Sequence, residues 1–147
     1  MFLHLIAVLF MLNIEPITND LPEKSGSILI NISNIRSATG KINVSLFATT
    51  DGFPSNPQKA VAIQSLEIEG NQATLRFNNV PFGTYGIACH HDENGNGKMD
   101  TNLLGIPKEG YGISNNALNR FSKPQFEAAK FPFNEAVQSI NIKMFYW

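Results

Sequence analysis

The chain has a single cysteine among its 147 residues, which excludes an internal disulfide framework. Cys89 lies inside an apolar, strand-like stretch, a position typical of a small buried hydrophobe rather than of a reactive thiol. A protein of this size without disulfides is stabilised by its hydrophobic core or by a bound ion. Eleven phenylalanines supply much of the apolar material for such a core.

Charged residues are also scarce, at 16% of the chain against roughly 25% in an average soluble domain. The net charge is −1, and the sequence has no basic stripe and no platform of mixed basic and aromatic residues. This composition excludes a nucleic-acid partner and gives no electrostatic case for binding to an anionic membrane. The length fits one domain, and we expect that domain to span residues 25–147.

Long apolar runs are absent apart from the first dozen residues, MFLHLIAVLFML. A run of roughly 11 apolar residues is too short to span a bilayer, which requires about 20. It matches the apolar centre of a secretory signal peptide, although no Lys or Arg precedes it and no small-x-small cleavage site follows it. We therefore predict a signal peptide over residues 1–20, no transmembrane segment in the mature protein, and a periplasmic, cell-surface or extracellular location.

From Gly26 onward, apolar residues alternate with polar ones, which is the pattern of strands with one buried face. The pattern predicts strands near residues 28–33, 41–48, 73–77, 84–91 and 136–146, and leaves 60–69 ambiguous. The first two strands are expected to pair as a hairpin through the turn at 37–40. Short strands separated by turn signals indicate an all-β fold, a single β-sandwich of about seven strands of prealbumin or immunoglobulin type.

The region after the strand 85–91 has no clear strand or helix pattern from residue 92 to about 124. Loops of that length are uncommon in compact domains, and those that occur often carry a function. Glycine, proline and asparagine are frequent between residues 105 and 117 and shape the backbone there. We therefore expect a long but ordered loop.

This region opens with HDENGNGKMD, a motif that is typical of calcium-binding loops. Oxygen-bearing side chains alternate along the motif, a glycine follows them and an aspartate closes it, so that a short loop can surround a hard cation with oxygen ligands. The predicted ligands are Asp92, Asn94, Asn96, the backbone carbonyl of Lys98, and Asp100. Calcium is the predicted cofactor, with a weak dissociation constant of ~10⁻⁴–10⁻³ M because two ligands are neutral amides.

One position departs from an EF-hand loop. The twelfth residue, which supplies a bidentate glutamate in an EF-hand, is Leu103 here. A further ligand would then come from Glu109, from Asn102 or from water. The competing interpretation is a plain turn, in which the two Asn-Gly pairs only supply positive φ angles. Two of the four aspartates in the chain lie at the ends of the motif, which favours the ion.

The two histidines beside the motif, His90 and His91, invite a transition-metal or catalytic interpretation. Adjacent residues on a strand point to opposite faces, so both cannot bind one ion without distortion. Cys89 and His91 share a face, but two ligands do not make a zinc site. We expect His91 to pack under the loop and to form a hydrogen bond with it. No catalytic residue is predicted.

The chain resembles a family of exported bacterial proteins, domain of unknown function 2141. The resemblance covers roughly residues 26–146 and implies no established activity. It is carried by ordered motifs at residues 51–54, 85–88, 91–102, 105–112, 114–117 and 123–127.

A second resemblance concerns the segment VPFGTY at residues 80–85. It is similar to the proline-glycine-x-tyrosine turn of transthyretin-like and carboxypeptidase-regulatory domains, which implies a prealbumin-like sandwich by analogy. The tyrosine-arginine-glycine-serine ending of the transthyretin-like hydrolases is absent, because this chain ends in KMFYW.

The sequence therefore favours an exported, non-enzymatic β-sandwich module that binds calcium through the loop 92–100. A first alternative is an extracellular ligand- or glycan-binding module that presents Tyr111 and the loop 105–117. A second alternative is a small hydrolase centred on His91 with a carboxylate of the loop. The sequence identifies no protein partner.

Overall fold

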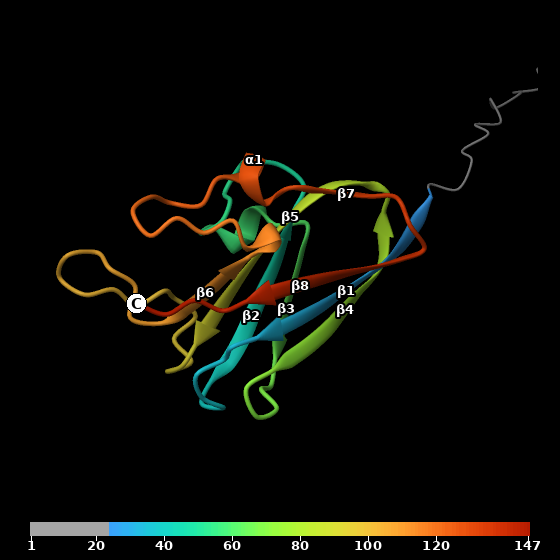
Figure 1. Ribbon diagram of the computed structural model, residues 1–147. Coiled ribbons are helices and arrows are strands. Elements are labelled where there is room, and N and C mark those ends of the chain that lie inside the picture. The colour runs from blue at the N-terminus through green and yellow to red at the C-terminus, as the bar shows by residue number, and fades with distance from the viewer. Residues whose placement is uncertain (1–23) are drawn as a thin grey trace, which may run out of the picture.

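The computed structural model describes residues 24–147, which form eight strands in two sheets (Figure 1). The predicted signal peptide, residues 1–20, lies outside the described part of the chain. The strands are β1 (Ser25–Ser33), β2 (Lys41–Phe47), β3 (Ala62–Leu66), β4 (Ala73–Pro81), β5 (Gly83–Asp92), β6 (Gly110–Ile113), β7 (Phe131–Phe133) and β8 (Val137–Lys143). The all-β class is confirmed, and the described chain has eight strands rather than about seven.

The first sheet has three strands in the order β4-β1-β8. β1 pairs antiparallel with β4, and Ile30 lies opposite Leu75. On its other side β1 pairs parallel with β8, where Ile30 lies opposite Ile140. β8, the last of the eight strands, therefore lies beside β1, which is the central strand of this sheet.

The second sheet has five strands, with β3-β2-β5-β6 in order and β7 paired to another part of β5. β5 is the central strand, because β2 pairs along one edge while β6 and β7 pair along the other. At its C-terminal end, His91 lies between Ile42 of β2 and Gly110 of β6. That end of β5 leads directly into the predicted ion loop.

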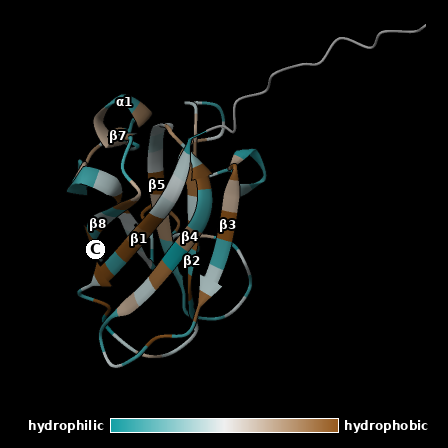
Figure 2. Cartoon of the chain, turned by 90° about the vertical axis from the view of Figure 1, so that its right-hand side faces the viewer, coloured by the Kyte–Doolittle hydropathy of each residue, from teal (hydrophilic) through white to brown (hydrophobic). Residues whose placement is uncertain are grey.

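Alternating residues of both sheets meet in one hydrophobic core. Ile30 of β1, Val44 of β2 and Ile87 of β5 are each 0% exposed and belong to the same cluster. Burying a side chain of this size fully is worth about 1.5–3 kcal/mol. Figure 2 shows the resulting change between hydrophobic and hydrophilic residues along β1 and β4.

A smaller apolar cluster lies on the opposite face of the second sheet. It contains Phe47 of β2 and Ala88 of β5 and is covered by a short helix, α1 (Phe126–Ala129). The rings of Phe53 and Phe126 meet edge-to-face, with centroids 5.6 Å apart. Among residues 24–147 no helix is long and apolar enough to cross a membrane.

The predicted hairpin between the first two strands is wrong. β1 and β2 belong to different sheets, and the connection at 34–40 passes from one sheet to the other. Ile35 in this connection is 3% exposed and its N–H donates to the carbonyl of Asn71, 3.1 Å away. Both strands bury one face in the same core, and their alternation does not specify which neighbour each one pairs with.

The long region expected to lack secondary structure is interrupted by β6 and by a 3₁₀ turn, η2 (Ser114–Asn116). Ser114 is 0% exposed, and its hydroxyl accepts a hydrogen bond from the N–H of Ile87 (2.9 Å) and donates one to the carbonyl of Ala129 (2.7 Å). A second 3₁₀ turn, η1 (Pro57–Lys59), precedes β3. The segment 105–117 is therefore largely ordered framework rather than a free loop.

Cys89 is buried within the core at 3% exposure, as its apolar surroundings predict. Burial raises the pKa of its thiol, because the thiolate would lose its hydration. We expect the native protein not to react with a thiol-specific chromogenic reagent on the minute timescale, whereas the unfolded protein reacts at once. Rapid labelling of the native protein would contradict this placement.

Candidate metal centre

β5 places its two histidines on opposite faces of the sheet, as strand geometry requires. His91 is 0% exposed and points into the core side, where its ring nitrogens contact the Tyr146 hydroxyl (2.8 Å) and the Thr39 carbonyl (2.7 Å). Its burial was expected, but its hydrogen-bond partners were not, since neither of them belongs to the loop 92–100. A completely buried imidazole with both nitrogens engaged is a poor candidate for a hydrolytic base.

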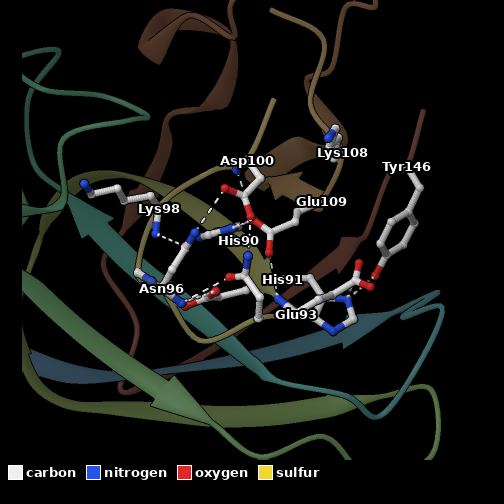
Figure 3. A network of polar contacts seen from close by, with 12 residues as sticks. His90, His91, Glu93, Asn96, Lys98, Asp100, Lys108, Glu109 and Tyr146 are labelled. Atoms are coloured by element: carbon white, nitrogen blue, oxygen red, sulfur yellow. Dashed lines mark hydrogen bonds and ion pairs between the residues drawn. The ribbon is translucent and has the colours of Figure 1, made fainter. Parts of the chain in front are cut away.

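The contacts of His91 fix its tautomer. A backbone carbonyl can only accept, so Nε2 carries the proton and Nδ1 accepts from Tyr146. Burial is the main cause that raises the pKa of Tyr146, which keeps its hydroxyl available as a donor. The Arg36 guanidinium lies 4.7 Å above the Tyr146 ring and pairs with Glu93 at 2.6 Å. This network supports the base of the loop from the core side (Figure 3).

The loop itself is organised by side-chain oxygens that accept backbone N–H groups. Asp92, 4% exposed, accepts from Asn96 at 3.2 Å and from Gly97 at 2.9 Å. The side-chain oxygen of Asn94 accepts from the Asn96 N–H at 3.1 Å, and that of Asn96 accepts from the Lys98 N–H at 2.8 Å. Backbone N–H groups therefore orient both carboxylate oxygens of Asp92 and the single amide oxygen of Asn94 and of Asn96.

Asp100 closes the loop onto its beginning. Its carboxylate accepts hydrogen bonds from the amide groups of Asn94 and, at 3.0 Å, of Asn96. The four predicted side-chain ligands are thus brought together. Gly95 and Gly97 have the positive φ angles, 72° and 73°, that a tight turn at the Asn-Gly pairs requires. The turn geometry is present, and hydrogen bonds within it hold the four side chains together.

Glu109, at the end of the long loop, joins the same cluster. It is 4% exposed, and one carboxylate oxygen accepts from the N–H of Glu93 at 2.9 Å. The other accepts from the N–H of Asp100 at 3.1 Å and lies 2.8 Å from the His90 Nε2 atom. Glu109 therefore connects both ends of the loop, whereas the other protein candidate, Asn102, uses its oxygen within a separate turn.

His90 is the residue that the sequence alone did not place at the site. Ligand atoms of His90, Asp92 and Glu109 all lie within 4.8 Å of one another. β6 pairs Tyr111 with His90, which brings the preceding Glu109 against the histidine. The sequence contains no local signal for this pairing, because the two partners are separated by the whole loop.

The charge of the cluster is unbalanced. Three carboxylates, those of Asp92, Asp100 and Glu109, gather there, and within residues 24–147 no lysine or arginine forms an ion pair with any of them. Only His90 contacts one as a group that can carry positive charge. The ammonium group of Lys98 points away from the cluster (Figure 3). An arrangement of this kind is stabilised by a cation.

Comparison with protein families identifies the group to which these residues belong. The family described as an uncharacterized protein conserved in bacteria, domain of unknown function 2141 (DUF2141), matches residues 30–141. The chain belongs to this family. The stretch matched to DUF2141 contains the whole cluster, from His90 to Glu109. No curated protein and no solved structure was found to match the chain.

Proposed function

We propose that this DUF2141 member is an exported, non-enzymatic β-sandwich domain of prealbumin or immunoglobulin type whose loop 92–100 binds calcium. The two sheets and their shared core support the sandwich architecture, and the apolar start of the sequence supports export. The observation that carries the calcium proposal is the gathering of three carboxylates without a lysine or arginine partner among the described residues.

Burial strengthens the repulsion between the carboxylates of the cluster. Asp92 and Glu109 are each 4% exposed, so water screens their mutual repulsion poorly. A divalent cation between them replaces this repulsion by attraction, and Asp100 adds a third negative ligand. Because the backbone already orients the carboxylate and amide oxygens, little side-chain entropy remains to be lost when an ion binds.

The donor set is that of a hard cation. Oxygen atoms would come from Asp92, Asn94, Asn96, the Lys98 carbonyl, Asp100 and Glu109, within the six to eight ligands that calcium accepts at about 2.3–2.6 Å. Two ligand atoms of one such ion lie at most about 5 Å apart, and the carboxylate oxygens of Asp92 and Glu109 meet this condition, since they lie within 4.8 Å of each other. Glu109 would supply the carboxylate that Leu103, 105% exposed, does not.

An ion also has a route to the loop. A groove of ≈ 480 Å³ opens beside it, and its lining includes the polar side chains of Asn43, Ser65, Asp92 and Asn94. Polar walls of this kind allow a hydrated cation to approach and to exchange its waters stepwise for protein oxygens. The groove supports reversible binding of an ion from solution.

Calcium is expected to raise the melting temperature of the mature domain. In about 10 mM calcium, which is roughly 10–100 times the predicted dissociation constant of ~10⁻⁴–10⁻³ M, an ion that binds only the folded state adds about 1.4–2.7 kcal/mol, or about 4–8 °C for a domain of this size. The Asp92→Ala variant should lose this rise, and Asp92→Asn, which keeps the side-chain volume, should lose most of it. Melting curves followed by circular dichroism, with chelator and with millimolar calcium, give the measurement.

The matched control is Asp51→Asn, because Asp51 is an exposed aspartate that pairs with Lys59 and not with the loop. It should keep the full calcium response. A wild-type melting temperature that does not change in millimolar calcium would show that the motif is only a turn.

A further inference from the structure

Two surface turns, at residues 101–107 and 119–122, are built in the same way. In the first, the side-chain oxygen of Asn102 accepts from the N–H groups of Leu104 (2.8 Å) and Ile106 (3.0 Å). In the second, the side-chain oxygen of Asn119 accepts from the N–H of Phe121 (3.0 Å). An isolated β-bridge closes each turn. Both are therefore defined structures rather than loose chain.

Each turn presents large apolar side chains to solvent. Leu103, Leu104 and Phe121 are 105%, 83% and 93% exposed. Single exposed apolar residues are common on soluble proteins, but here three almost fully exposed ones occupy the tips of two ordered projections. Figure 1 shows both turns projecting from the same side of the molecule, near the end of the chain.

The bases of the two turns are linked by aromatic rings. The Arg120 guanidinium of the second turn lies 5.3 Å above the Phe145 ring. Tyr111, in the strand that follows the first turn, packs edge-to-face on the same ring, with centroids 5.6 Å apart. Trp147 also packs edge-to-face against Phe145, with ring centroids 5.7 Å apart. Tyrosine and tryptophan are the aromatic residues that favour the interface between lipid and water.

The exposed charges in the segment that carries the turns have one sign. Between residues 98 and 123 they are Lys98, Lys108, Arg120 and Lys123, all of them cations. The two acidic residues of this segment, Asp100 and Glu109, are turned into the candidate metal centre. The net charge of −1 over the whole chain conceals this local positive excess. A net charge near zero therefore does not prevent this segment from binding an anionic membrane.

We propose that the turns 101–107 and 119–122 form a docking face for an anionic lipid surface. Leu103, Leu104 and Phe121 would enter the boundary between headgroups and acyl chains, while the four cations contact lipid phosphates. A lipid surface fits these residues better than a protein partner does, because a fluid layer accepts separate convex tips without matching their shape. A stable protein interface needs a continuous surface of about 800 Å² from each partner.

The test is cosedimentation of the mature protein with lipid vesicles, in millimolar calcium throughout. We expect binding to vesicles that contain phosphatidylglycerol and much weaker binding to phosphatidylcholine alone. The double variant Leu103→Ser/Leu104→Ser should bind at least about tenfold more weakly, because two leucine side chains no longer leave water. Substituting Lys108 and Arg120 by glutamine should weaken binding by about fivefold for each charge removed.

Val61→Ser/Ile63→Ser is the matched control, since both residues are exposed, at 59% and 50%, but lie at the start of and within β3. It should bind as the wild type does. The proposal is overturned if the wild type does not bind, if it binds neutral and anionic vesicles equally, or if the two serine double variants lose the same affinity. The turns are closed by their own hydrogen bonds and do not need an ion to keep their shape. Either proposal, calcium binding or lipid binding, can therefore fail while the other holds.

Discussion

The substitution Gly40→Ala is expected to destabilise the protein by about 2–5 kcal/mol. Gly40 has a φ of +75°, which costs an alanine about 1–2 kcal/mol. In addition, a Cβ atom on Gly40 would lie 2.0 Å from the backbone oxygen of Asp92 and 2.7 Å from the Cα atom of Glu93. Backbone atoms cannot rotate away as a flexible side chain can, so the start of β2 must separate from the end of β5.

Gly70→Ala is the matched control for this effect. Gly70 has a similar φ of +66°, but nothing lies within 4 Å of the position that its Cβ would take. It should lose only the conformational contribution, about 1–2 kcal/mol. Urea denaturation of the two variants, fitted with a common m-value, measures the difference. Equal losses in the two variants would contradict the close packing of Gly40 against the candidate metal centre.

The individual strands could be predicted because their signal is local. Ile28, Ile30 and Ile32 alternate with more polar residues, and the structure buries all three in one core. Alternation of this kind depends only on the geometry of one strand, whose successive side chains point to opposite faces. Such a pattern can therefore be read without knowledge of the neighbouring strands.

Strand pairing could not be predicted, because it depends on residues that are distant in the sequence. The pairing of β1 with β8 joins Ile30 to Ile140, and it is parallel, which no turn signal announces. β1 and β2 follow one another in the sequence but lie in different sheets. A hairpin prediction assumes that consecutive strands pair, and here the connection at 34–40 crosses between the layers.

The candidate site also contains both residues that the sequence could predict and residues that it could not. Asp92, Asn94, Asn96 and Asp100 are contiguous in the sequence, so the motif indicated them, and the structure brings their side chains together. Glu109 was one of several possible additional ligands, and only the pairing of β6 with β5 brings it to the cluster. The sequence shows that His90 and His91 cannot both bind one ion. It does not show that the face of β5 that carries His90 is the one that meets Glu109.

Replacing Glu109 by glutamine is expected to remove the calcium response of the melting temperature. Glutamine has nearly the same shape, and its oxygen can still accept from the N–H of Glu93. In chelator, the variant should change in stability by no more than about 1–2 kcal/mol, because the removal of one of three negative charges from a site that is 4% exposed is offset by the loss of the hydrogen bond from the Asp100 N–H, which the glutamine amide nitrogen cannot accept. In calcium, the rise of about 4–8 °C should fall below about 1 °C, since affinity follows the charge of the ligands.

The calcium response separates an ion ligand from a residue that only holds the loop in place. If Glu109 only holds the loop by accepting from Glu93 and Asp100, then Glu109→Gln lowers the melting temperature by the same amount in chelator and in calcium. Glu135→Gln changes an exposed glutamate in the connection before β8 and should leave both curves as in the wild type. Isothermal titration with calcium adds a direct readout, in which the heat of binding disappears for Glu109→Gln and persists for Glu135→Gln. A glutamine variant that keeps the full calcium response would remove Glu109 from the proposed coordination sphere and leave the loop 92–100 without its third carboxylate.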